Sequence, residues 1–209
     1  MTQKIDPAER RPSVLVGIAG GSASGKTTLT AALEKLLASG PAPVRVEAIG
    51  MDRYFYRGTA PGPLFTSPST GETLPDNNHP DSADNARLAA DLDARRNSAT
   101  APDIILLEGL MALHVQEIRD RCDLRIFVEL DADVRALRRL LRDMSGVRGN
   151  PDPRFIATYY CECARVGHER YVEPSRQHAD LILRGDGDLN RTVPMAAAVI
   201  HSLLPSGDL

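Results

Sequence analysis

Residues 20–28 read Gly20-Gly21-Ser22-Ala23-Ser24-Gly25-Lys26-Thr27-Thr28, and residues 20–27 match the phosphate-binding pattern G-x-x-x-x-G-K-[ST]. Glycines let backbone N–H groups converge on phosphate oxygens, and a helix that starts at the loop directs its positive end at the same anion. The apolar run at 13–18 is typical of a buried strand, and leucines recur at helical spacing over 29–37. This context favours a nucleotide-binding P-loop over a glycine-rich turn without a ligand.

Two side chains of the loop have specific expected roles. Lys26 would reach the outer phosphates of a nucleotide, and the Thr27 hydroxyl would coordinate Mg²⁺. We therefore assign residues 20–28 to the binding of a nucleoside triphosphate. The loop alone does not say what becomes of that nucleotide, because one fold hosts many functions.

Strands and helices alternate along the rest of the chain. Further strands are expected at 44–49, 104–107, 124–130 and 180–183, and helices at 84–96, 110–121, 132–144, 155–171 and 194–204, the last with Pro194 in its first turn. A long loop rich in Pro, Gly, Ser and Thr spans 57–80, and loops of this length are usually lids, binding loops or disordered segments. The alternation predicts an α/β fold: a five-stranded parallel sheet with helices on both faces.

Composition limits the class of protein. The chain has 209 residues, of which 42% are hydrophobic and 25% charged, with a formal net charge of −3. These values predict one globular domain over 1–209 and give no global positive field that would attract nucleic acid or a membrane. Three cysteines cannot form a closed set of disulfides, residues 1–13 lack the apolar core of a signal peptide, and no apolar run is long enough to span a membrane. We therefore expect a cytoplasmic protein.

Two acidic residues follow predicted strands. Asp52 comes after the strand at 44–49, and Glu108 directly follows the strand at 104–107. Parallel strands place their carboxyl ends at the edge of the sheet where ligands bind. We therefore expect Asp52 to act as the base on an acceptor hydroxyl and Glu108 to hold Mg²⁺; the alternative for each is a helix cap or a solvated acid in a turn.

Arginines cluster in and after the predicted helix at 132–144. Arg135, Arg138, Arg139 and Arg142 share one helical face, and Arg148 and Arg154 follow. Stacked like charges repel, so an anionic ligand such as a triphosphate would stabilise them. The alternative is a solvated face paired with neighbouring acids, namely Asp131, Asp133 and Asp143.

Several motifs, in order, resemble the uridine kinase and phosphoribulokinase group of P-loop kinases. They are GIAGGSASGKTT (17–28), MDRYFYR (51–57), NHPDSAD (78–84), LLEGLMAL (106–113), DADVRALRRLLRD (131–143) and EPSRQHADLILRG (173–185). The resemblance covers most of the chain and implies a single P-loop kinase domain, with a lid at about 131–158 and a substrate-side loop at about 57–80. It also implies ATP and Mg²⁺, with transfer of the γ-phosphoryl group to a primary hydroxyl of a small metabolite.

The resemblance assigns roles residue by residue. It implies Lys26, Asp52, Arg139 and Arg142 as catalytic residues, and Thr27, Asp52 and Glu108 as the residues that handle Mg²⁺. Asp186 or Asp188 falls near the adenine, and we assign Asp188 to the nucleotide. For the acceptor we assign Tyr54, Phe55, Asn78, His79 and His114.

The chain departs from the family pattern on the acceptor side. Asn78 stands where these kinases have an aspartate that holds the ribose hydroxyls, and residues near Asn150 and Thr158 replace an expected arginine and glutamine. The family's pyrimidine-contacting hairpin has no room here, because only residues 97–102 separate the helix at 84–96 from the next strand. The loop at 57–80, or residues 54–56 with His79, would supply a substitute pocket.

The leading hypothesis is an ATP-dependent kinase that acts on a nucleoside-like hydroxyl, with a possible homo-oligomeric state. One alternative is a kinase of another hydroxylated metabolite, such as a riboside, a sugar phosphate or a pantothenate-like acid. Another is a nucleotide-binding switch without an acceptor. The guanine-reading motif Asn-Lys-x-Asp is excluded, because the lysines are Lys4, Lys26 and Lys35.

Overall fold

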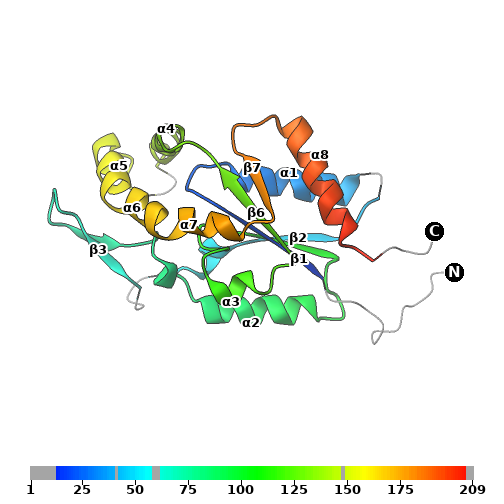
Figure 1. The fold of residues 1–209 in the computed structure, drawn as a ribbon. Helices are drawn as coiled ribbons and strands as arrows, with labels where there is room; N and C mark the ends of the chain where they lie inside the picture. The colour runs from blue at the N-terminus through cyan, green and yellow to red at the C-terminus, as the bar shows by residue number, and fades with distance from the viewer. Residues whose placement is uncertain (1–12, 41, 58–61, 147–148, 206–209) are drawn as a thin grey trace.

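The central sheet has five parallel strands in the order β2-β5-β1-β6-β7 (Figure 1). The computed structural model describes residues 13–40, 42–57, 62–146 and 149–205. The strands are β1 (Val14–Gly20), β2 (Val46–Gly50), β5 (Ile104–Glu108), β6 (Leu124–Glu129) and β7 (Leu181–Arg184). Both β1 and the first four residues of β5 are buried, as expected for central strands covered on both faces. The predicted α/β fold with a five-stranded parallel sheet is confirmed.

Helices cover both faces of the sheet, as predicted. On one face α1 (Lys26–Ser39) and α8 (Leu189–Ser202) pack over side chains such as Val16 and Ile18 of β1. On the other face α2 (Asn85–Arg96) and α3 (Gln116–Arg119) pack over Leu15 and Ala19. Alternate residues of β1 therefore supply two separate apolar cores, which fix the strand between the helical layers.

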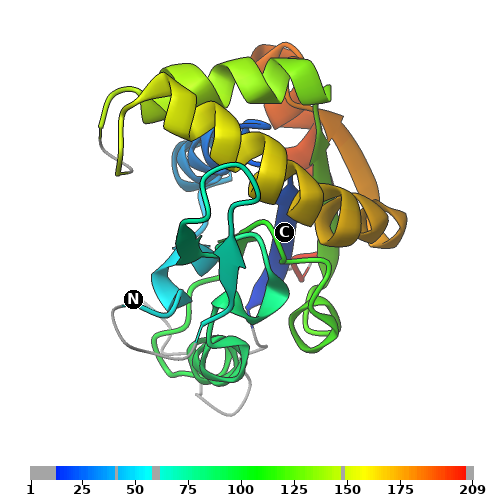
Figure 2. The same ribbon diagram turned by 90° about the vertical axis from the view of Figure 1, so that its left-hand side faces the viewer.

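A long helical segment, residues 153–178, replaces the predicted helix at 155–171. It is built from α5 (Pro153–Tyr159), π-helical η4 (Tyr160–Ala164), α6 (Arg165–Gly167), π-helical η5 (His168–Val172), α7 (Glu173–Ser175) and the 3₁₀ turn η6 (Arg176–His178). Pro174 has no N–H to donate to the helical hydrogen-bond ladder just after η5. The arginine-bearing helix α4 (Ala132–Asp143) lies beside this segment, above a small hairpin (Figure 2).

That hairpin corrects the irregular loop expected at 57–80. Its strands, β3 (Leu64–Thr66) and β4 (Thr73–Pro75), pair antiparallel, and the 3₁₀ turn η3 (Pro80–Ser82) follows. Three-residue strands carry too little alternation to be recognised from sequence. The hairpin tip is bound to the long helical segment, because Ser67 donates a hydrogen bond to Glu162 over 2.6 Å.

Two predicted helices differ from the structure. Over 110–121 only α3 is helical, because residues 110–115 form turns that bury Met111 and Leu113 in the core. Helix α8 begins at Leu189, with the Asp188 side chain as its cap, so Pro194 lies inside the helix and not in its first turn. Residues 1–12 and Arg148 lie outside the described residues. None of the described helices is long and apolar enough to cross a membrane.

Candidate active site

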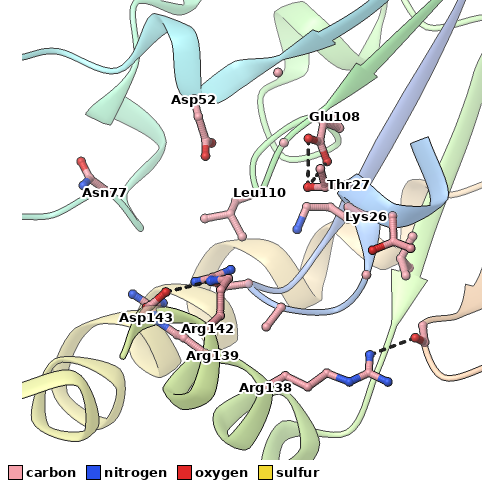
Figure 3. A pocket seen from close by; sticks show the side chains of 18 of the residues that line it. Lys26, Thr27, Asp52, Asn77, Glu108, Leu110, Arg138, Arg139, Arg142 and Asp143 are labelled. Atoms are coloured by element: carbon pink, nitrogen blue, oxygen red, sulfur yellow. Dashed lines mark hydrogen bonds and ion pairs between the residues drawn. The ribbon is translucent and has the colours of Figure 1, made fainter. Parts of the chain in front are cut away.

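One large cavity lies at the carboxyl ends of the central strands. Its volume is about 1290 Å³, more than a single small ligand needs. The P-loop and the start of α1 border it on one side, the hairpin and α5 on another, and α4 on a third (Figure 3). The predicted residues Lys26, Thr27, Asp52 and Glu108 all line this cavity, together with Arg138, Arg139 and Arg142.

The P-loop backbone has a conformation that its sequence makes possible. Gly20 and Gly25 have φ angles of 142° and 104°, in the region that favours glycine. A Cβ atom at Gly20 would lie 2.4 Å from the Val128 carbonyl oxygen of β6, so this glycine also permits close packing on the sheet. Gly25 has no side chain to cap α1. The N–H groups of the first helical turn are therefore available to donate hydrogen bonds to an anion in the cavity.

Lys26 is a partly buried cation at the point where the loop ends and α1 begins. Its Nζ donates a hydrogen bond to the Gly21 carbonyl oxygen over 2.9 Å. Burial lowers the pKa of Lys26 from 10.5 to about 8, while the nearby carboxylates of Glu108 and Asp52 raise it and Arg142 lowers it further. An anion bound beside Lys26 would restore the preference for the charged form.

This pKa predicts how nucleotide binding depends on pH. Because the pKa is lowered to about 8, Lys26 is charged below that pH and becomes neutral above it in the free protein. We expect the affinity for a triphosphate to be constant near pH 7 and to fall about tenfold between pH 7 and pH 9. Titration calorimetry over this range measures the change. In Lys26→Ala the pH step should vanish, and a step of equal size in that variant would contradict the assignment.

The two predicted acids lie at the ends of adjacent strands. Glu108 ends β5, and its carboxylate accepts hydrogen bonds of 3.0 and 2.9 Å from the Thr27 hydroxyl. Asp52 lies in the 3₁₀ turn η2 (Met51–Tyr54) directly after β2, and its carboxylate projects into the open space across from Lys26 (Figure 3). The structure thus brings both acids to the P-loop, as their strand-end positions predict.

These oxygen donors suit Mg²⁺. The Thr27 hydroxyl and the carboxylates of Glu108 and Asp52 line the same cavity. Among the described residues no group of three or more His, Cys, Asp or Glu side chains forms a complete metal cage. Mg²⁺ normally binds through one or two carboxylates together with substrate phosphates and water, so the donors present fit an ion that arrives with the nucleotide.

The arginine helix α4 presents three of its four predicted arginines to the cavity. Arg138 donates a hydrogen bond to the Gly185 carbonyl oxygen over 3.0 Å, and Arg142 approaches the Ser22 hydroxyl at 3.4 Å. Arg139 lies over the Tyr159 ring, 5.5 Å from its centroid. Arg135 differs, because it is buried against the backbone of Gly21, where a Cβ would lie 2.7 Å from its Nη1.

The arginines are only partly paired with acids. Arg139 and Arg142 both contact Asp143, but Arg138 and Arg135 donate hydrogen bonds to backbone carbonyl oxygens. Arg154 is exposed on α5 and does not line the cavity. The interpretation as a solvated, acid-paired face therefore does not hold for Arg135, which is buried, whereas Arg138 is exposed.

Only some of the residues predicted for the acceptor line the cavity. Phe55 and Asn78 line the cavity as expected, and the structure adds Asn77 and Tyr159. The Tyr159 hydroxyl donates to the Pro75 carbonyl oxygen over 3.0 Å and accepts a bond of 3.2 Å from the Asn78 amide. The only sequence signal for Asn77 was its position beside Asn78. Tyr159 had none, because its role depends on the hairpin packing against α5.

Four predicted residues lie elsewhere. Tyr54 is buried in the core, where its hydroxyl donates to Asp91 over 2.9 Å. The rings of His79 and His114 both pack edge-on against Tyr171, at centroid distances of 5.1 and 5.3 Å. Asp188 caps α8, and its neighbours Asp186, Gly187, Leu189 and Thr192 line the cavity instead. None of these four lines the cavity, because helix capping and core packing direct their side chains away from it.

The parallel sheet, the P-loop at its edge and the acids beside it define the class of P-loop phosphotransferases. Comparison with known proteins narrows this class. The family model described as Phosphoribulokinase / Uridine kinase family matches residues 76–189, more than half of the chain. The chain therefore belongs to the phosphoribulokinase and uridine kinase family.

The chain is also similar to individual kinases in sequence and in fold. The chain is 33% identical to a uridine kinase of Deinococcus deserti over 93% of this chain and 98% of the relative. It is 32% identical to a uridine kinase of Staphylococcus epidermidis over 92% and 97% of the two chains. Its fold is similar to that of a putative fructose transport system kinase from Silicibacter, with a TM-score of 0.60, 21% identity and coverage of 85% and 92%. The protein is a kinase that acts on a hydroxyl group of a small molecule.

Proposed function

We propose that the protein is an ATP-dependent kinase that transfers the γ-phosphoryl group to a primary hydroxyl of a nucleoside-like acceptor. The observation that carries this proposal is the arrangement of one cavity with two distinct ends. Phosphate-binding groups, namely Lys26, Thr27 and the N-terminus of α1, lie on one side, and Asp52 lies opposite them toward Asn77 (Figure 3). Two substrates can therefore meet in line at Asp52.

Each residue has a role that follows from its charge and position. Asp52 accepts the proton of the acceptor hydroxyl as the new bond to phosphorus forms. Lys26, Arg139 and Arg142 neutralise charge on the group in transfer. Thr27, Glu108 and Asp52 would hold Mg²⁺, which when bound neutralises part of the phosphate charge. The β- and γ-phosphates would lie between the P-loop and α4, since both line this part of the cavity.

The acceptor end has surfaces suited to a ring with hydrogen-bonding edges. Apolar surface comes from Phe55, Leu74, Phe155 and Tyr159, and carboxamides come from Asn77, Asn78 and Asn150. Aromatic faces bind flat rings, and carboxamides both donate and accept hydrogen bonds. The relatives named uridine kinase support a nucleoside as the acceptor.

One observation favours a second candidate, a kinase of another hydroxylated metabolite. The amide nitrogen of Asn78 contacts both the Tyr159 hydroxyl and the Cys163 thiol, at 3.2 and 3.4 Å. The amide hydrogens are thus engaged inside the protein, and Asn78 has only its oxygen to offer an acceptor. The acceptor wall also comes from the hairpin that precedes α2, a different origin from the one that the family pattern implies.

An acceptor screen with ATP and Mg²⁺ tests the proposal. We expect a pyrimidine or purine nucleoside to raise the rate of ADP formation at least about tenfold over the acceptor-free rate, with one phosphoryl group added to the acceptor. Mass spectrometry identifies the product, and Lys26→Ala serves as the catalytic blank. Stimulation by a sugar phosphate or an acid alone would favour the second candidate. Nucleotide binding without stimulation by any compound would indicate a switch and contradict both kinase proposals.

A further inference from the structure

An acid lies among the phosphate-binding arginines, where its charge has the wrong sign for an anion site. Asp143, the last residue of α4, is buried and lines the cavity together with Arg139 and Arg142. A carboxylate at this position repels a triphosphate and weakens its binding. Its presence therefore requires a benefit other than affinity.

The geometry of its contacts suggests that benefit. Arg139 donates from Nε to one carboxylate oxygen of Asp143 over 3.2 Å, and Arg142 donates from Nε to the other oxygen over 2.7 Å. Both hydrogen bonds use the inner nitrogen of the guanidinium group. The outer nitrogens, which bind phosphates in paired fashion, are not consumed by these bonds to Asp143.

The two guanidinium groups need such a partner. Burial and the nearby charge of Arg142 lower the pKa of Arg139, and the charge of Asp143 raises it. Without Asp143 the two cations would repel across the cavity. Arg139 also contacts the Tyr159 ring. Among the hydrogen bonds of the described residues, the Arg142 side chain makes one besides its bond to Asp143, the 3.4 Å approach to Ser22.

We propose that Asp143 is a positioning residue that holds Arg139 and Arg142 side by side, with their outer nitrogens directed to the phosphates. This inference rests on the proposed function, because it assigns the arginines to the group in transfer. Asp143 increases the rate of transfer and at the same time weakens the binding of the nucleotide. No other acid of α4 has this position: Asp133 is exposed and accepts a hydrogen bond from the Val134 N–H of its own turn.

Removal of the charge should therefore change affinity and rate in opposite directions. In Asp143→Asn we expect the triphosphate to bind about 3- to 10-fold more tightly, because the repulsion is gone. We expect kcat to fall about 10- to 100-fold, because correctly placed arginines contribute strongly to phosphoryl transfer. A purely structural role would lower affinity, rate and thermal stability together.

The experiment measures binding and turnover on the full chain. Titration calorimetry with Mg²⁺ and the non-hydrolysable analogue AMP-PNP gives affinity without any acceptor, and steady-state kinetics at saturating substrates give kcat. Asp133→Asn is the matched control, since it removes the same charge from the same helix outside the cavity, and it should change neither value by more than about twofold. Thermal unfolding verifies that each variant is folded.

The outcomes separate this inference from the proposed function. Tighter AMP-PNP binding with slower turnover supports the positioning role, whereas weaker binding, or no change in either value, overturns it. If Asp143→Asn does not fold, Asp143→Glu decides: unchanged affinity with a kcat about 3- to 10-fold lower supports the role, and an unchanged kcat overturns it. If the wild type binds AMP-PNP but phosphorylates no acceptor, the proposed function fails, and acceptor-independent ATP hydrolysis then replaces kcat as the rate measured.

Discussion

Asp52→Asn should reduce the rate of phosphoryl transfer by about 10²- to 10⁴-fold and leave ATP binding largely intact. The carboxylate of Asp52 lies after β2 and projects into the cavity, facing the acceptor end. An amide has the same shape but cannot accept the proton of the acceptor hydroxyl. The substitution also reduces the negative charge beside the partly buried Lys26, so a modest rise in nucleotide affinity is consistent with this role.

Steady-state kinetics with an acceptor identified by the screen measure the loss, and AMP-PNP calorimetry measures binding. The matched control is Glu47→Gln, since Glu47 lies on β2, the strand that leads to Asp52, and pairs with Arg95 away from the cavity. The control should retain wild-type turnover. Full activity in Asp52→Asn would refute its role as the base and move the search for a base to the other cavity acids.

Lys26→Ala should lower kcat by about 10²- to 10³-fold, because it removes a preorganised positive charge from the phosphate site. The side chain is partly buried and contacts the loop backbone through the Gly21 carbonyl oxygen. We expect the free protein to keep its thermal stability. Desolvation already disfavours the charged lysine, so its removal relieves this cost while it removes a cation that interacts with Glu108 and Asp52.

Lys35→Ala is the matched control for Lys26→Ala, because Lys35 lies on the same helix α1 with an exposed side chain. Turnover, AMP-PNP affinity and the unfolding temperature are compared for both variants. The control should match the wild type in all three. A Lys26→Ala protein with wild-type turnover would show that the phosphates bind elsewhere and would remove the basis of the kinase proposal.

Local patterns in the sequence were enough to predict which residues border the cavity at the P-loop. The loop at 20–28 needs glycines at particular positions for its backbone to close on an anion, and Lys26 and Thr27 follow it at a set spacing. Asp52 and Glu108 were predictable for a related reason. A parallel sheet brings the carboxyl ends of its strands to one edge, so an acid that follows a buried strand lies near the P-loop.

The acceptor end could not be predicted in the same way. Its wall is the hairpin β3–β4 packed on α5, and the contact of Tyr159 with Pro75 joins residues 84 positions apart in the chain. Tyr54 and His79 are close in sequence to Phe55 and Asn78, yet neither of them lines the cavity. Neighbouring residues of a turn point in different directions, and long-range packing decides which of them reaches a ligand.

The chain's own pattern of glycines, strand-end acids and periodic apolar residues was sufficient for the fold class, the P-loop and the acids beside it, because those features depend on local geometry and on the common edge of a parallel sheet. Tertiary structure alone decided the shape of the proposed acceptor wall, the capping role of Asp188 and the hydrogen bonds from Arg139 and Arg142 to Asp143. These features arise where side chains from separate elements meet, and their directions are set by packing and charge pairing that no local pattern records.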